Sequence, residues 1–136
     1  MNFAANKDLL YRLADDELII GHRNSEWTGI GPILEEDIAF SSMAQDEVGH
    51  AQAFYKLLHE MLGEAHPDQI AFNRPSHDFR SCHLVEQPIG DYAYSLARHA
   101  CYDMAEAVRL ADLQKSSLPP LAELAKKLGR EEQYHQ

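Results

Sequence analysis

Two short stretches of the chain, Glu47-Val-Gly-His50 and Glu132-Gln-Tyr-His135, share the pattern Glu-x-x-His. In a helix, residues three positions apart lie on the same face, so each stretch can direct a carboxylate and an imidazole at one metal ion. Four-helix bundles with a dinuclear iron or manganese centre combine two such motifs with one Glu from each of the other two helices. The two motifs therefore predict an all-α bundle built around a metal centre.

Two further acids complete that ligand set. Glu17 and Glu106 lie in the two predicted helices that lack a Glu-x-x-His motif. A single Glu-x-x-His carries little information, because Glu and His are common on helix surfaces. The full set predicts a dinuclear metal site whose carboxylates are also the candidate catalytic groups, with the ligands Glu17, Glu47, His50, Glu106, Glu132 and His135.

Apolar residues with helical spacing predict four helices, separated by clusters of glycine and proline. Gly63 is a stop signal for the second helix, and Asp91 is a suitable N-cap for the third. The predicted helices cover residues 5–26, the stretch from just after Pro32 to about Leu62, residues 91–114, and the stretch from Pro119 or Pro120 to the end of the chain.

Residues 64–90 show no sustained period and contain several prolines. We expect a long connection there, with a short helical turn near residues 68–72. Ferritin-like bundles join their second and third helices by a crossover along the length of the bundle, which gives such a connection a reason to exist. The predicted fold is an all-α ferritin-like four-helix bundle with a long crossover between helices 2 and 3, forming one domain over residues 1–136.

The predicted ligands fall at matching heights in this fold. Glu17 and Glu47 lie at similar distances from the first turn, and Glu106 and Glu132 at similar distances from the last. The crossover makes the second and third helices parallel, with Glu47 and Glu106 at similar depth. Buried carboxylates are costly unless they are neutralised, and two divalent metal ions would neutralise these.

Other acids lie close to these positions. Asp15 and Asp16 compete with Glu17 as ligands, and we prefer Glu17 for its apolar flanks and its height. Asp46 and Asp103 are candidates for the outer carboxylates that accept the second N–H of a ligating histidine.

The ligand types indicate the chemistry. Carboxylates can bridge two irons and tolerate a change of oxidation state, imidazole adds one neutral nitrogen per metal, and open positions remain for dioxygen. The set predicts a pair of iron ions that activates dioxygen, with manganese as the alternative metal.

Composition limits the class of partner. The chain has 136 residues and a formal net charge of −10, which argues against nucleic acid as a ligand. Its two cysteines make no disulfide framework, which favours a reducing cytoplasm. We expect neither a secretory signal nor a membrane span, and a dimer or other oligomer is the default expectation.

The stretch Leu13-Ala-Asp-Asp-Glu-Leu-Ile-Ile-Gly-His-Arg-Asn-Ser-Glu-Trp-Thr-Gly29, followed by Gly31-Pro-Ile-Leu-Glu-Glu-Asp-Ile-Ala39, resembles the PaaA/PaaC family. Members are ferritin-like subunits of the multicomponent phenylacetyl-CoA oxygenase, an epoxidase. Leu84-Val-Glu-Gln-Pro-Ile-Gly-Asp91 is similar to the PaaC branch. That branch is usually a scaffold with its metal ligands largely replaced, whereas all six ligand positions here carry metal-competent residues. Family members also continue past this length, so we expect either a C-terminal truncation or a partner subunit that supports His135.

The resemblance implies a di-iron monooxygenase component in aromatic acid catabolism, with an aryl-CoA substrate, other oxygenase subunits and a reductase as partners. Two alternatives remain open. One is a non-catalytic structural subunit of the same complex. The other is a ferroxidase or iron-handling bundle.

Overall fold

The computed structural model describes residues 3–132, and the chain divides into two compact units, Met1–Ile89 and Gly90–Gln136. All regular elements of the described residues are helices, and these residues contain no strand. The all-α prediction is confirmed, and the helices are consistent with a ferritin-like helical bundle.

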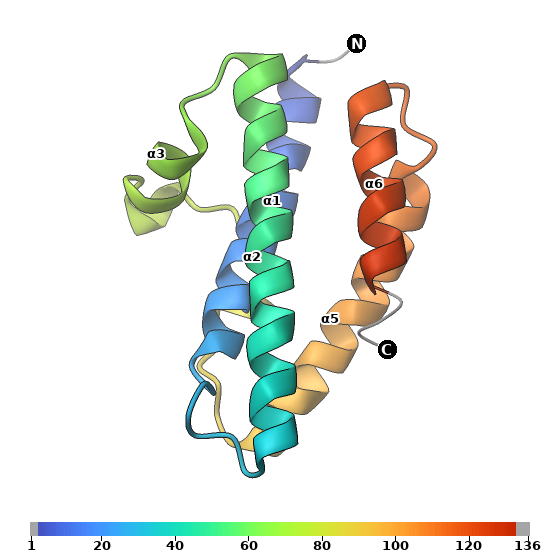
Figure 1. Cartoon of the computed structure of the whole chain (residues 1–136). Helices are drawn as coiled ribbons and strands as arrows, with labels where there is room; N and C mark the ends of the chain where they lie inside the picture. The colour runs from blue at the N-terminus through green and yellow to red at the C-terminus, as the bar shows by residue number, and fades with distance from the viewer. Residues whose placement is uncertain (1–2, 133–136) are drawn as a thin grey trace. The chain divides into compact units, whose positions relative to one another are not determined.

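The first unit is built on a helical hairpin. Helix α1 (Phe3–Ser25) and helix α2 (Leu34–Leu62) run antiparallel and lie side by side along most of their length (Figure 1). These bounds agree with the predicted ones to within two residues. Their facing apolar side chains form the core of the unit, because helical spacing brings them to one face. The most deeply buried include Leu10, Leu13, Ile20, Phe40, Phe54 and Leu58.

Two glycines shape the turn between these helices. Gly29 has φ of 84°, a left-handed conformation that favours glycine. A Cβ on Gly31 would lie 2.9 Å from the Cα of Asp37. The carboxylate of Asp37 accepts hydrogen bonds from the N–H groups of both glycines, at 2.8 and 3.3 Å. Trp27 closes the turn from inside, with its ring centroid 6.3 Å from that of Phe40.

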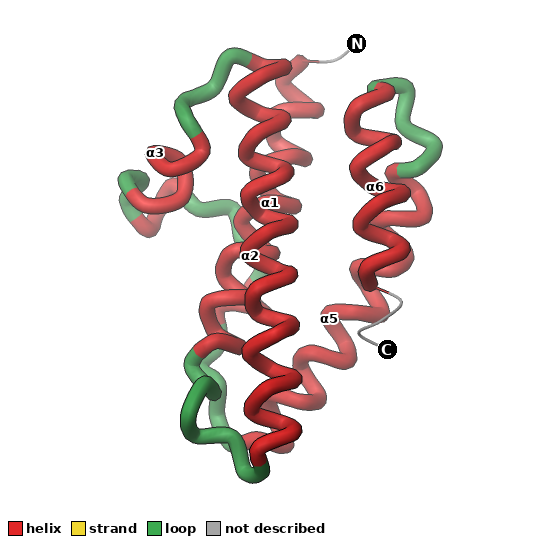
Figure 2. The backbone as a smooth tube through the Cα atoms, in the orientation of Figure 1, coloured by secondary structure: helices red, strands yellow, loops and turns green. Residues whose placement is uncertain are grey.

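Helix α2 ends at the predicted stop. Gly63 has φ of 71°, and its N–H bonds back to the carbonyl of Leu58. The connection that follows contains three short helices separated by loop segments, and Figure 2 draws the loops of the chain in green. The first confirms the turn expected at 68–72; the others are too short to leave a periodic signal. The three are α3 (Pro67–Phe72), η1 (Ser76–Asp78) and α4 (His83–Glu86).

Arg74 fastens the connection to the hairpin. Its guanidinium pairs with the fully buried carboxylate of Asp15 on α1. The same group lies over the rings of Phe79, Tyr11 and Tyr55, at 4.1, 5.1 and 5.9 Å from the ring centroids. Tyr55 of α2 donates its own hydrogen bond to Asp15, at 2.6 Å. One ionic cluster thus joins both long helices to the crossover.

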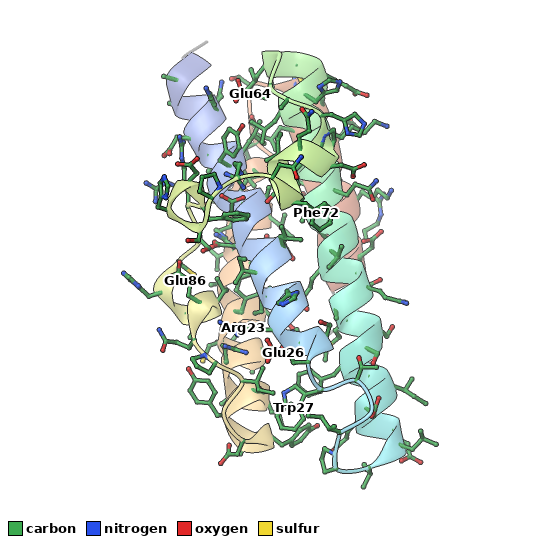
Figure 3. The ribbon with its side chains drawn as sticks, turned by 90° about the vertical axis from the view of Figure 1, so that its left-hand side faces the viewer. Arg23, Glu26, Trp27, Glu64, Phe72 and Glu86 are labelled. Carbon is green, nitrogen blue, oxygen red and sulfur yellow. The ribbon has the colours of Figure 1, made fainter. Side chains whose placement is uncertain are left out.

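Further along, the connection follows α1 toward the turn. The backbone N–H of Cys82 donates to Asp16 at 2.7 Å. Arg23, near the end of α1, donates to the carbonyl of Glu86 at 3.0 Å, and Figure 3 shows these two residues on neighbouring elements. The crossover therefore returns along the hairpin, as the sequence predicts.

The second unit is also a helical pair, α5 (Tyr92–Leu113) and α6 (Pro119–Glu132). Asp91 is the N-cap of α5, as predicted, and accepts a hydrogen bond from the N–H of Tyr94 at 2.8 Å. Proline begins α6, where its missing N–H costs nothing. The buried apolar residues of this unit include Leu110, Leu118, Leu121, Ala125 and Leu128.

Candidate metal centre

Glu17 on α1 and His50 on α2 meet inside the first unit. Both side chains are buried, with 1% and 3% of the residue surface exposed. Their nearest polar atoms, Nδ1 of His50 and Oε2 of Glu17, are 3.8 Å apart. Two ligands of one ion, each about 2.0–2.2 Å from it, lie no more than roughly 4.4 Å apart. The separation is therefore within the range for a shared metal ion.

Glu47 lies one helical turn before His50 and is equally buried. Its Oε1 accepts a hydrogen bond from Nδ2 of Asn24, at 2.9 Å. Asn24 is itself fully buried and lies on α1. The amide thus fixes one oxygen of Glu47 and sets the direction in which the carboxylate faces.

Gly21 allows the two helices to approach each other at this level. A Cβ placed on Gly21 would lie 3.0 Å from Cγ2 of Val48, 3.2 Å from Cβ of Glu47 and 3.3 Å from the carbonyl oxygen of Ala44. These contacts are tighter than most contacts that a Cβ makes in proteins. A side chain here would require α1 and the helix that carries Glu47 to shift apart slightly.

Three of the buried polar side chains of the hairpin offer metal-binding atoms. Glu17, Glu47 and His50 offer carboxylate oxygens and an imidazole nitrogen from facing helices. This is the donor set that iron and manganese take in carboxylate-rich sites. By donor type and burial, these three residues suit a metal ion of this kind, although their side chains are not gathered around one point in this structure.

The two acids next to Glu17 serve a different purpose. Asp15 is held by Arg74, Tyr55 and the backbone N–H of Arg80, and Asp16 accepts from Cys82. In this structure, both acids hold the crossover. Glu17 is the acid of this run that faces His50, as its apolar flanks predict.

In the second unit, Glu106 on α5 is fully buried. Its Oε2 pairs with the guanidinium of Arg109, one turn along the same helix. Arg109 also donates to the hydroxyl of Tyr102 at 3.4 Å, and its guanidinium lies 5.7 Å from the centroid of that ring. Glu106 therefore has a cationic partner on its own helix.

The two predicted outer carboxylates differ in position. Asp103 is buried, and its Oδ2 lies 2.9 Å from Nε2 of His99, four residues earlier on α5. Asp46 is exposed on α2. Of these two, only Asp103 is placed among buried polar groups.

The remaining predicted ligands lie at the limit of the structure. Glu132 is the last residue of α6, and its side chain is not among those described. His135 lies outside the described residues. Over residues 3–132, no group of three His, Cys, Asp or Glu side chains is gathered in a way that could hold a metal ion.

Sequence reasoning missed two residues that contact the predicted ligands. Asn24 lies seven positions after Glu17, so both occupy one face of α1, and this spacing is a signal that could have found it. Arg109 lies three positions after Glu106, the ordinary spacing of a helical ion pair. An i,i+3 pair is usually a surface feature, and only the burial of Glu106 gives this one significance.

Comparison with known proteins adds an independent line of evidence. The family model described as phenylacetic acid catabolic protein, PaaA/PaaC, matches residues 2–136. The chain is 36% identical over 124 residues to one of the subunits of the 1,2-phenylacetyl-CoA epoxidase from Escherichia coli strain K12. The alignment covers 91% of this chain and 50% of that relative, so the chain spans about half the length of the curated relative it matches. Among the described residues, no helix is long and apolar enough to cross a membrane.

Proposed function

Because the chain belongs to the family of phenylacetic acid catabolic proteins, we propose that it is a component of an oxygenase that acts on phenylacetyl-CoA or a related aryl-CoA thioester. The proposed activity is the dioxygen-dependent monooxygenation or epoxidation of the aromatic ring at a di-iron centre. The proposal rests on the family match and on the relative that is named as part of an epoxidase.

The observation that carries the metal part of the proposal is the trio Glu17, Glu47 and His50. All three are buried in the α1–α2 hairpin at 3% exposure or less. Burying a carboxylate costs several kcal/mol unless a cation or hydrogen bonds compensate for the lost water. Two buried carboxylates and an imidazole on facing helices are the donor types that a metal cation of this kind takes.

We assign Glu17, Glu47 and His50 to the ligands from the first helical pair, and Glu106, Glu132 and His135 to those from the second. When bound, the metal pair would supply the reaction with dioxygen, which protein side chains cannot perform. The chain's own groups have a positioning role: Asn24 orients Glu47, and Gly21 sets the spacing of the helices that carry Glu17 and Glu47. The apolar residues around them exclude water.

The partners follow from the same assignment. A monooxygenase of this kind needs electrons, so a reductase is an expected partner together with other oxygenase subunits. An aryl-CoA thioester is the expected substrate, and assembly into a homo- or hetero-oligomer is the expected state. A reducing cytoplasm, which suits both ferrous iron and free cysteines, is the proposed location.

A second candidate function is a structural role in the same complex, without catalysis. One observation favours it: Glu106 already has a cationic partner in Arg109. A buried carboxylate that is neutralised by the protein itself has less need of a metal ion.

The deciding experiment is the metal content of the purified chain after anaerobic reconstitution with ferrous iron. We expect about two irons per chain, the number in a dinuclear carboxylate centre, and an optical spectrum that changes on exposure to air. Glu47→Ala should remove the iron and leave the helical circular dichroism intact. Glu60→Ala, an exposed change on the same helix, should keep it. Stoichiometric iron in Glu47→Ala would contradict the ligand assignment, and no iron in the wild type would favour the structural role.

A further inference from the structure

Arg109 contacts a proposed metal ligand in the second unit. It lies on α5 one turn after Glu106, and its Nη2 is in contact with Oε2 of that carboxylate. Glu106 is fully buried, whereas the side chain of Arg109 is 33% exposed. The pair therefore joins a buried acid to a base that reaches solvent.

The position of Arg109 is supported from one side. Tyr102, one turn before Glu106, accepts a hydrogen bond from the same Nη2 at 3.4 Å. Its ring lies beneath the guanidinium, 5.7 Å from the centroid, within the range of a cation–π interaction. Tyr102 is buried, whereas the side chain of Arg109 is partly exposed to solvent.

A guanidinium and a metal cation bind the same oxygen atoms of a carboxylate. Each needs its negative charge and its oxygen lone pairs, and a guanidinium keeps its own charge at any accessible pH. The guanidinium already occupies Oε2 of Glu106, and a metal ion on the same oxygen would meet that positive charge at short range. The ion pair and metal ligation through Oε2 are therefore alternatives.

We propose that Arg109 stands in for the metal ion at Glu106. It neutralises the carboxylate while the metal site is empty and swings outward to solvent when an ion binds. This inference rests on the proposed function, because it takes Glu106 to be a metal ligand. It makes metal affinity depend on a residue that does not itself touch the metal.

The test is an anaerobic titration of the full chain with Fe²⁺ by calorimetry, repeated with Co²⁺ followed by visible absorption. Arg109→Gln removes the competing charge. Because a hydrogen bond to a charged group contributes about one to two orders of magnitude in an equilibrium constant, we expect Arg109→Gln to bind metal about 10- to 100-fold more tightly. Arg109→Lys, which keeps the charge, should stay near the wild-type affinity.

A charge-matched control separates this competition from a general change in net charge. Arg12 is an exposed arginine that pairs with Asp8 on the same helix. Arg12→Gln changes the net charge by the same amount, and it should leave the metal affinity unchanged. An equal increase in metal affinity in Arg109→Gln and Arg12→Gln would overturn the proposal.

A measurement on the wild type avoids dependence on any variant's folding. The side-chain Nε–H resonance of Arg109 should be sharp in the metal-free protein, where the guanidinium is held. It should broaden or merge with those of exposed arginines when diamagnetic Zn²⁺ is added. A resonance that stays sharp in the zinc-loaded protein would overturn the proposal.

The outcomes distinguish this inference from the proposed function. If the wild type binds metal and Arg109→Gln binds no more tightly, Arg109 does not compete and the metal centre stands. If only Arg109→Gln binds metal, Arg109 keeps the site closed in the natural chain, which supports both the inference and a structural role. If neither binds metal, the inference and the metal centre fall together.

Discussion

Asn24 is a residue whose contribution can be isolated, because its amide holds one defined oxygen of a proposed ligand. The distance from that amide to Oε1 of Glu47 is 2.9 Å. We predict that Asn24→Ala weakens iron binding about 10- to 100-fold, the usual cost of losing a partner that orients a metal ligand. The measurement is an anaerobic Fe²⁺ titration. Asn73→Ala, an exposed change at the end of α3, is the control, and equal affinities for the two variants would contradict this role.

Asp15 should matter for stability. It is fully buried, and it neutralises Arg74, whose side chain is only 15% exposed. We predict that Asp15→Ala lowers the free energy of unfolding by about 3–5 kcal/mol, since it leaves a largely buried guanidinium without its partner. Urea denaturation measures the loss.

A matched change tests the role of burial in that prediction. Asp8 also pairs with arginines, Arg12 and Arg80, but these pairs lie at the surface. Exposed pairs contribute little because water and salt screen them. Asp8→Ala should therefore cost much less than Asp15→Ala, and similar losses would show that burial of the Arg74 pair is not what stabilises the crossover.

The packing of α1 against α2 depends on Gly21. Its Cβ position is already within 3.0–3.3 Å of atoms on α2. We predict that Gly21→Ala costs about 1–3 kcal/mol of stability, because a close-packed interface must move to accept the methyl group. The same change also displaces Glu47, so metal binding should weaken with it.

Gly49 provides the contrast for the same measurement. It lies in α2, and a Cβ there would meet no atom within 4 Å. Alanine has the better helix propensity, so Gly49→Ala should stabilise the protein by about 0.5–1 kcal/mol. Thermal and urea unfolding of both variants check the pair. A loss of stability in both would mean that helix spacing at Gly21 is not the cause.

Tyr11 links α1 to the residues just after α2, because its hydroxyl donates a hydrogen bond to the carboxylate of Glu64 at 2.7 Å. Burial, and then this bond, raise the pKa of Tyr11 from 10.0 to about 12. A raised pKa means that the folded state holds the proton more tightly. This contribution is therefore complete below pH 10 and is lost as the pH rises toward 12.

Replacing Tyr11 should flatten that alkaline decline. We predict that the stability of Tyr11→Phe falls less between pH 10 and 12 than that of the wild type, as measured by urea denaturation at a series of pH values. The exposed Tyr94→Phe should follow the wild-type curve. Identical slopes for Tyr11→Phe and the wild type would rule out Tyr11 as the titrating group.

Much of this architecture is predictable because long amphipathic helices leave a strong periodic signal. The bounds of α1, α2 and α5, the Asp91 cap and the Gly63 stop all follow from it. The crossover is different. Arg74 contacts Asp15 and Tyr55, which lie far from it in the sequence. The local pattern of residues 73–82 does not predict these contacts.

Part of the candidate site could also be predicted from the sequence, and part could not. The helical period places Glu17, Glu47, His50 and Glu106 each on the buried face of its own helix. The contacts that Asn24 and Arg109 make with these ligands depend on the distance between two side chains, and a periodic pattern carries no information about such distances. The choice of Glu17 over Asp15 and Asp16 follows from its apolar flanks, whereas the contacts of those two acids with the crossover could not be predicted from the sequence.

For the molecule as a whole, a bound metal should act on global stability. Any ligand that binds the folded state alone stabilises it by mass action, by about 2.7 kcal/mol at 100 times the dissociation constant. We predict that anaerobic ferrous iron raises the unfolding temperature of the wild type and of Glu60→Ala, but not that of Glu47→Ala. Differential scanning calorimetry measures this. A rise in Glu47→Ala equal to that in the wild type would place the iron elsewhere.

The run Asp15-Asp16-Glu17 also has a consequence for the order in which the chain assembles. The crossover docks on Asp15 together with Tyr55, so its docking surface exists only once α1 and α2 have closed on each other. Contacts between Arg74 and Asp15, and between Cys82 and Asp16, span 59 and 66 positions. Contacts at such separation form late, whereas those near a short turn form early. We therefore expect Glu17 and His50 to meet before the crossover docks on Asp15 and Asp16.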